Sequence, residues 1–388
     1  MSLVRRFTFC LIAGFAFVSL GCTGSTEPVV EVEKTSWVGK HIVAKRLKTK
    51  KYLFTADGQI RPAGQLTSYT GLVKAEEKKG DLDYVLVRMG REEFWVELDE
   101  VCLLDEANAY FDSVLNESSR AYEPRVLRAA VNIESGRPEK AFDDLNEAHR
   151  VKPNVHFPLT MRAKAYEMMG EYTKAYADYD KVLKFDTNNL AVFLGRARVL
   201  HALGRTDNSL IDLDAAIRCD PNCIPAYLAR AEIWELRKED QAAQQDFDQA
   251  AAKAPANPDV PTARGQYWLR KKNYAKAIAE FDNALKMEPE HVNALVGKSL
   301  LLAAGGDRQW HDAATAVELS NKACELTGWK DASAIDSLGV AHAANGNFTE
   351  AGKFVKQALD DPLYTKKHGE SAKKRLALFQ NNLPFTME

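Results

Sequence analysis

Apolar and small residues recur with a period of 34 residues through the middle of the chain. Residues 173–187 read TKAYADYDKVLKFDT, and further along residues 275–289 read AKAIAEFDNALKMEP. Each period contains two stretches with the three- and four-residue spacing of apolar residues that is typical of an amphipathic helix. The pattern predicts five consecutive helix–turn–helix units, which we place at residues 122–155, 156–189, 190–223, 224–257 and 258–291.

Equivalent positions in these units hold side chains of similar size. Small residues allow helix axes to approach to about 8–10 Å, and large apolar residues fill the space between them. A small residue recurs in the first helix at Ala129, Ala163, Ala197, Ala231 and Gly265. The second helix repeats a small residue at Ala141, Ala175, Ser209, Ala243 and Ala277, and a large one at Leu145, Tyr179, Leu213, Phe247 and Phe281. Because one unit cannot cover its own apolar face, we expect the units to stack in a row.

A proline closes most units, at Pro153, Pro221, Pro255 and Pro289. The order of small, aromatic and proline positions resembles the tetratricopeptide repeat. The resemblance implies a mainly α fold, an α–α superhelix of about seven repeats over residues 120–365 with capping helices at its ends. The sixth repeat begins at Val292 and carries additional residues around GDRQWHDAA, and the seventh lies near 332–365. Residues 366–388 are expected to form a C-terminal capping helix and tail.

The same period extends backwards beyond the first unit. Ala107, Phe111 and Val114 have the spacing of a second helix and precede the corresponding residues of the first unit by one period. The segment 105–118 is therefore predicted to be a capping helix in register with the repeats. We expect it to dock the preceding part of the chain rigidly onto the first repeat.

Glycine is expected in the left-handed conformation between the two helices of a unit, where it ends the first helix. The glycines in this place are Gly136, Gly170, Gly204, Gly306 and Gly346. Lys238 and Lys272 replace the glycine in two units, which should cost about 1 kcal/mol each.

Charged residues also follow the 34-residue period. Basic residues recur on the first helix at Arg128, Arg162, Arg196, Arg230, Arg264 and Lys298. Acidic residues recur on the second helix at Asp144, Asp178, Asp212, Asp246 and Glu280. The arginines could form a track for an anionic ligand, or each could pair with an acid on a neighbouring helix. The matching periods of the two signs favour ion pairs that hold the stacking register.

Residues 35–104 lack the helical period and contain short runs rich in valine and aromatic residues, which predict strands. The start at Trp37, the strand FWVEL and the closing VCLL resemble bacterial SH3-like domains of cell-envelope proteins. The resemblance implies a small all-β barrel before the superhelix. Trp37, Tyr69, Phe94 and Trp95 could line a ligand groove of this barrel or form its core.

The N-terminus reads as a targeting segment. Two arginines precede the apolar run 7–20, which is too short to cross a bilayer but suits a signal-peptide core. The run ends in SLGC at 19–22, which resembles the lipobox of bacterial lipoproteins, although the usual Leu lies one place late. We therefore expect a signal peptide over 1–21, a lipid-modified Cys22 and a flexible tether over 22–34, with simple cleavage nearby as the alternative. Export to the bacterial cell envelope, with anchoring by lipid on its periplasmic or surface side, follows from this interpretation.

The net charge and the motif content of the sequence disfavour nucleic-acid binding, catalysis and metal binding. The formal net charge of −2 argues against nucleic acid as a partner. None of the common catalytic or phosphate-binding motifs occurs, and the eight histidines are scattered. Cys219 and Cys223 lack further ligands nearby, so core cysteines are a better interpretation than a metal site. We expect no catalytic residue, no metal and no cofactor.

The resemblance to tetratricopeptide repeats implies that the first helices line a concave groove that binds partner proteins or peptides. Carried over by position, the groove residues are Phe157, Thr160, Lys164, Glu167, Leu194, Arg198, His201, Leu228, Glu232, Glu235, Thr262 and Gln266. The leading hypothesis is a non-enzymatic interaction scaffold of the cell envelope. One alternative is recognition of cell-wall glycan or peptide by the SH3-like domain, with the repeats as a spacer. An enzyme with an unrecognised site is the other.

Overall fold

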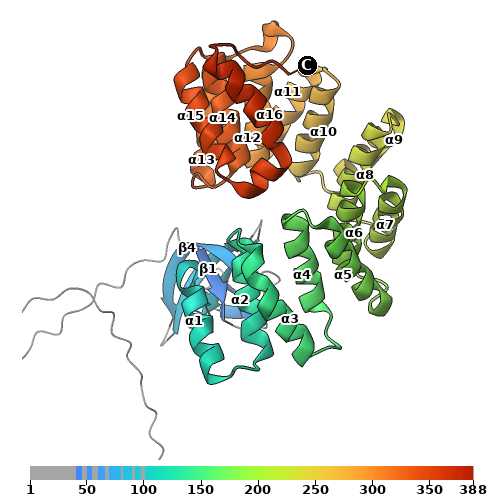
Figure 1. Cartoon of the computed structure of the whole chain (residues 1–388), viewed down its shortest axis with the longest axis vertical. Helices are drawn as coiled ribbons and strands as arrows, with labels where there is room; N and C mark the ends of the chain where they lie inside the picture. Colours follow the sequence, from blue (N-terminus) through green and yellow to red (C-terminus); the bar gives the residue numbers. More distant parts are fainter. Residues whose placement is uncertain are drawn as a thin grey trace, which may run out of the picture.

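The computed structural model describes residues 41–45, 50–54, 60–65, 70–79, 82–89, 92–97 and 101–387. The expected signal peptide, Cys22, the tether, Trp37 and Tyr69 lie outside these residues. The described chain consists of a seven-stranded sheet followed by a curved row of helices (Figure 1).

The sheet is antiparallel throughout, with the strand order β3-β2-β6-β5-β4-β1-β7. Its strands are β1 His41–Ala44, β2 Lys50–Phe54, β3 Ile60–Gln65, β4 Thr70–Lys79, β5 Leu82–Met89, β6 Glu92–Glu97 and β7 Val101–Leu103. The last strand pairs with the first, so the chain leaves the sheet next to the point where it entered.

Alternate residues of β1 face two different cores. Ile42 and Ala44 pack with Val87, Phe94 and Val96 inside the sheet domain. The residue between them, Val43, is fully buried on the other face, against the helices. This alternation follows from the two-residue period of a strand. Phe94 therefore belongs to the core of the sheet domain, with 4% of its surface exposed.

The sheet is joined to the helices through an apolar contact. Val43 and Cys102 pack against Ala107 and Phe111 of α1 (Leu104–Glu117), and Leu127 and Val131 of the next helix complete the cluster. Helix α1 follows β7 without a linker. The sheet and the first helices thus share this second apolar cluster, which leaves little freedom between them.

Seven helical hairpins follow α1, and α16 (Pro362–Gln380) packs on the last of them. Their first helices are α2 Tyr122–Glu134, α4 Phe157–Met168, α6 Leu190–Ala202, α8 Ile224–Leu236, α10 Asp259–Arg270, α12 Val292–Ala304 and α14 Ala332–Ala344. Their second helices are α3 Phe142–Val151, α5 Tyr172–Phe185, α7 Thr206–Cys219, α9 Asp240–Lys253, α11 Tyr274–Met287, α13 Ala313–Leu326 and α15 Phe348–Leu359. A 3-10 turn at Pro138–Ala141 precedes α3. Each of the five 34-residue periods at 122–155, 156–189, 190–223, 224–257 and 258–291 contains one of these hairpins.

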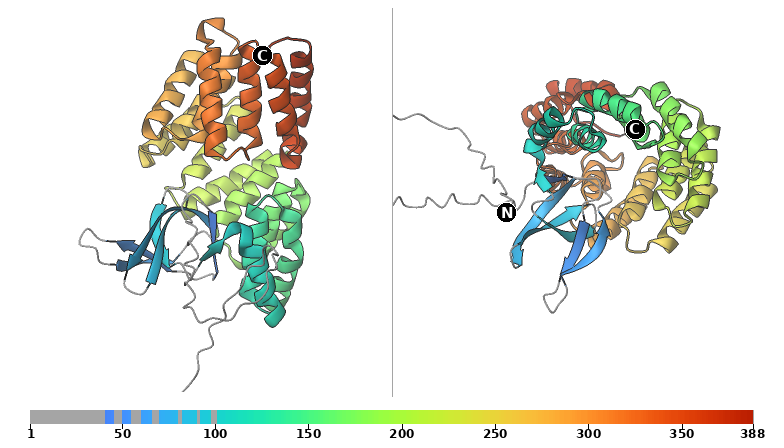
Figure 2. Two further views of the ribbon diagram at one scale, coloured as in Figure 1. Left: turned by 90° about the vertical axis from the view of Figure 1, so that its left-hand side faces the viewer. Right: turned by 90° about the horizontal axis from the view of Figure 1, so that it is seen from below.

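The first helices form the inner layer of the curve. Each of the first six contacts the first helix of the next repeat, and each second helix up to α13 packs between two first helices, whereas α15 packs between α14 and α16. Seen from below, the row of hairpins bends around, as Figure 2 shows. Lys366, at the start of α16, donates a hydrogen bond to the carbonyl oxygen of Met169, in the turn between α4 and α5. The curve thus brings the last helix back to the second repeat.

Aromatic side chains of the second helices fit against glycines of the first helices. Phe281 is fully buried between α10 and α12. A Cβ atom added at Gly265 would lie 2.9 Å from the Phe281 ring, and one added at Gly297 would lie 2.6 Å from it. Tyr179 meets Gly195 in the same way, at 2.5 Å. The size of the side chain at one position therefore limits the residue 16 positions later.

Most of the expected left-handed turns are present. Gly136 has a φ of 72°, and Lys238 adopts 63° in the same place. The prediction for Gly306 is wrong. Additional residues extend the connection after α12, so the chain does not need a tight turn there, and the left-handed residues of this repeat are Gly328 and Trp329, after α13.

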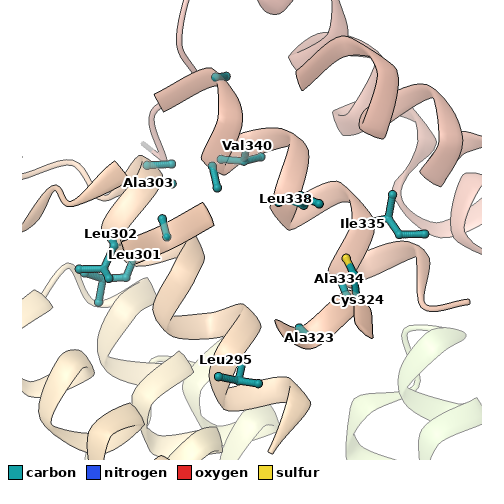
Figure 3. Packing of buried hydrophobic residues seen from close by; sticks show 14 of the residues in the cluster. Leu295, Leu301, Leu302, Ala303, Ala323, Cys324, Ala334, Ile335, Leu338 and Val340 are labelled. Carbon is teal, nitrogen blue, oxygen red and sulfur yellow. The ribbon is translucent and has the colours of Figure 1, made fainter. Parts of the chain in front are cut away.

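The sixth and seventh repeats share the largest apolar cluster. Leu295, Leu301 and Leu302 of α12 belong to this cluster together with Ile335 and Leu338 of α14 and Ala323 and Cys324 of α13 (Figure 3). Phe385 and Met387, in the segment after α16, pack on the same cluster, and the Met387 N–H donates to the carbonyl oxygen of Ala304 at 2.7 Å. This bond satisfies one of the free carbonyls at the C-terminal end of α12.

Candidate binding groove

The arginines of the first helices are held by carboxylates of the second helices. Each arginine donates to the acid 16 residues later in its own repeat, for example Arg196 Nε to Asp212 Oδ2 at 2.8 Å. The pairs are Arg128–Asp144, Arg162–Asp178, Arg196–Asp212, Arg230–Asp246 and Arg264–Glu280. The hydrogen bonds that Arg128 donates to the Asp144 carboxylate raise the pKa of Arg128. The ion-pair interpretation of these arginines is confirmed, so they do not form an open anion track.

A second set of partners lies 16 residues before each arginine. Arg196 also reaches Asp180 of the preceding repeat at 3.1 Å. The corresponding partners are Asp112, Asn146, Asp214 and Asp248 for the arginines and Asp282 for Lys298. Their 34-residue period was a signal in the sequence that our reasoning missed. Each basic side chain therefore ties two repeats together.

The predicted groove residues of α4 and α6 lie on the first helices, and two of them form an ion pair. Arg198 Nε donates to Glu167 Oε1 at 2.7 Å, which neutralises both side chains. Phe157 is 37% exposed, whereas Thr160, Leu194 and His201 are half-buried. Lys164 is exposed and forms no hydrogen bond or ion pair with the described residues.

A pocket of about 210 Å³ opens between α8 and α10. Three predicted groove residues line it: Leu228, Glu232 and Gln266. Its other walls are Ala229, Phe247, Ala263 and Arg270. The position-based reasoning missed these four. The pocket combines one buried phenylalanine, Phe247, with an alanine on each of the two first helices, Ala229 on α8 and Ala263 on α10. Because the alanine side chains are small, space remains beside the phenylalanine ring.

The charges at the rim of this pocket are unequal. Arg270 donates twice to Glu235, at 2.9 and 2.6 Å, and this bond raises the pKa of Arg270, with a smaller effect from Glu232. Glu232 itself is exposed and forms no hydrogen bond or ion pair with the part of the chain that the structure describes. The rim therefore carries one uncompensated negative charge.

Thr262 does not contribute to the groove. It is 4% exposed and donates to the carbonyl oxygen of Pro258 at 2.7 Å. His291, which caps α12, lies 3.4 Å from its hydroxyl and closes this edge. The groove position carried over from the tetratricopeptide repeat is wrong for Thr262, because the start of α12 covers its side chain.

Within the described residues there is no cluster of three or more potential metal ligands, and none of their helices is long and apolar enough to cross a bilayer. Burial raises the pKa of the Cys102 and Cys324 thiols to about 11. Cys219 donates to Asn188 instead of pairing with Cys223.

Comparisons with known proteins agree with this architecture. A family model described as "Tetratricopeptide repeat" matches residues 262–309. No curated protein matches the chain. Yeast Tom70 has a similar fold, with a TM-score of 0.58 and 21% identity over 72% of this chain and 58% of the Tom70 chain. The chain thus spans little more than half of the Tom70 structure.

Two further solved structures are similar over shorter or looser superpositions. A tetratricopeptide repeat protein from Parabacteroides merdae has a TM-score of 0.49 and 18% identity over 70% of this chain and all of its own. The Cut9–Hcn1 assembly of APC/C has a TM-score of 0.47 and 16% identity over 70% of this chain and 52% of its own. The repeat geometry, the family model and the Tom70 fold together support a tetratricopeptide-repeat protein.

Proposed function

We propose that this protein is a non-enzymatic scaffold that binds segments of other proteins along the inner face of its repeats. Tetratricopeptide repeats generally mediate protein–protein interactions. The observation that carries the proposal is the pocket between α8 and α10, with its apolar floor of Leu228, Phe247 and Ala263. It has the size of one apolar side chain and lies on the inner layer of helices, where an extended or helical partner segment would run.

The recurring ion pairs between the first and second helices support the same conclusion. They engage the periodic arginines in contacts between helices, so these residues stabilise the stack and are not displayed to a ligand. The side chains that remain exposed on the inner helices, such as Phe157, Lys164 and Glu232, are mixed in charge and polarity. A mixed surface of this kind suits a protein segment better than a uniformly charged polymer.

We further propose that the protein acts in the bacterial cell envelope, anchored by a lipid on Cys22. The proposal rests on the apolar run and the SLGC motif of the N-terminus. In this setting the strands before α1 belong to an SH3-like domain, which shares an apolar cluster with the first helices. The mass of the mature N-terminus tests the anchor: an unmodified Cys22, or cleavage elsewhere, contradicts it.

The binding function is tested by filling the pocket. Ala263→Trp places a large ring over Phe247, and the full chain should then lose binding to peptides that the unaltered protein selects from an array of exported proteins of its own cell. Ala252→Trp is the matched control, because Ala252 is exposed on the outer helix α9. Equal loss in both variants, or no loss in either, would contradict a site on the inner face.

A further inference from the structure

The inner face separates two uncompensated charges of opposite sign by two repeats. The ninth residue of each first helix, counted from the start of the 34-residue unit, is Lys164 in the second repeat, Arg198 in the third, Glu232 in the fourth and Gln266 in the fifth. These positions are equivalent, so their side chains form one row along the inner face. The row runs from positive through neutralised to negative.

In the middle of the row, the charge of Arg198 is neutralised by an ion pair. Arg198 is held by Glu167, which accepts from its Nε at 2.7 Å and from a terminal nitrogen at 3.2 Å. Arg270, beyond the negative end, is held in the same way by Glu235. Each pair consists of one positive and one negative group, so within this row Lys164 and Glu232 are the residues that carry a charge without an ion pair to the described residues.

The negative end coincides with the pocket. Glu232 stands on its rim, and Leu228, Ala229, Phe247 and Ala263 form its apolar walls. Gln266, on the opposite rim, forms no hydrogen bond with the described residues, so its amide can both donate to and accept from a peptide backbone. An apolar side chain can enter this pocket while a neighbouring basic side chain reaches the Glu232 carboxylate.

We propose that the partner is a protein segment with a defined charge order: an apolar residue flanked by a basic residue at the pocket, and an acidic residue that reaches Lys164 two repeats away. The inference rests on the proposed function and specifies its ligand. The charge order fixes the direction in which the segment lies along the groove, because the reversed segment would place like charges together. The selectivity comes from two single charges and one pocket.

The test uses the full chain and synthetic peptides in which one leucine is kept and the flanking positions are randomised among lysine, glutamate and serine, at a series of spacings. The unaltered protein should enrich peptides with lysine beside the leucine and glutamate at a distance from it. Glu232→Gln should weaken the selected peptides about two- to fivefold, as expected for one partly exposed ion pair. Glu232→Lys should select glutamate beside the leucine instead.

Lys164→Glu is the second test variant. It should change the preferred residue at the distant peptide position from glutamate to lysine and leave the preference beside the leucine unchanged. A matched control is Lys181→Glu on the outer helix α5, where Lys181 is exposed and, like Lys164, forms no ion pair with the described residues. Suppose that peptides bind and that Ala263→Trp abolishes binding, but that neither charge reversal changes the selected sequences. The proposed charge order is then wrong, while the inner face is still supported as the binding site. If no peptide binds, the proposed function itself fails.

Discussion

Substitution of Gly297 by alanine tests the packing rule on which the architecture depends. The added Cβ would lie 2.6 Å from Phe281 Cε1 and 2.7 Å from Cζ. Carbon atoms in contact prefer about 3.5–4.0 Å. The ring cannot retreat towards α10, since the place of a Cβ on Gly265 is only 2.9 Å from the same ring.

Two opposing terms set the magnitude. Overpacking of a filled core typically costs about 1–3 kcal/mol. Replacing glycine by alanine inside a helix returns about 1 kcal/mol. Gly352→Ala in α15 isolates the second term, because its Cβ would meet only Leu376 Cδ1, at 3.5 Å. Gly352→Ala should therefore stabilise the protein, and the free energies of unfolding of the two variants should differ by about 1–3 kcal/mol.

Urea unfolding of the full chain measures both variants, and a third variant identifies the cause. Phe281→Leu removes part of the ring, so Gly297→Ala should be less harmful in that background, with a coupling energy of about 0.5–3 kcal/mol. If Gly297→Ala stabilises as much as Gly352→Ala, or if the coupling is zero, the phenylalanine does not fill the space between the two glycines and the packing rule is refuted.

Three further outcomes follow from the structure. Asp212→Ala should lower the free energy of unfolding by about 1.5–3 kcal/mol in urea titrations, because buried Asp212 holds Arg196. Asp180→Ala, which removes the less buried partner of the same arginine, should cost at most about 1 kcal/mol. Lys238→Gly should raise thermal stability by about 1 kcal/mol, since Lys238 has a φ of 63°; a loss of stability would mean that the turn is not left-handed. Cys102 and Cys324, with pKa values of about 11, should remain protonated and unmodified by iodoacetamide at pH 8 while half-exposed Cys219 reacts, as peptide mapping by mass spectrometry would show; rapid modification of Cys102 and Cys324 would contradict their burial.

The 34-residue period was sufficient to predict the helices of the repeats, because each repeat meets the same neighbours and so selects the same residues. It failed where the chain departs from the period. Gly306 has the right place in the sequence, but the additional residues after α12 remove the tight turn, and its N–H instead donates to the Tyr274 hydroxyl at 2.9 Å. Thr262 has the position of a groove residue, but the start of the next repeat buries it.

The pocket illustrates why the binding surface was harder to predict than the fold. A position in a repeat tells which face a side chain occupies, but a pocket depends on sizes at several positions at once. Ala229, Phe247 and Ala263 form a recess only in combination. In the second and third repeats the equivalent space is taken up differently, by Tyr179 against Gly195. Pairwise comparison of residues 16 positions apart would have shown the difference.

The charged residues also divide into those that stabilise the stack of repeats and those that are candidates for contact with a partner. A periodic charge has a partner in every repeat, because the neighbouring helix repeats too, as Arg162, Arg196 and Arg230 show with their acids. A charge that breaks the period has no partner that recurs from repeat to repeat: Arg198 and Arg270 each find a single acid, whereas Lys164 and Glu232 form no ion pair with the described residues. Glu232 and Lys164 occupy equivalent places with opposite signs, so stacking cannot have selected both for the same contact. In a repeat protein the residues that violate the period are therefore the first candidates for contact with a partner, and here they lie on the inner face, one of them beside the pocket.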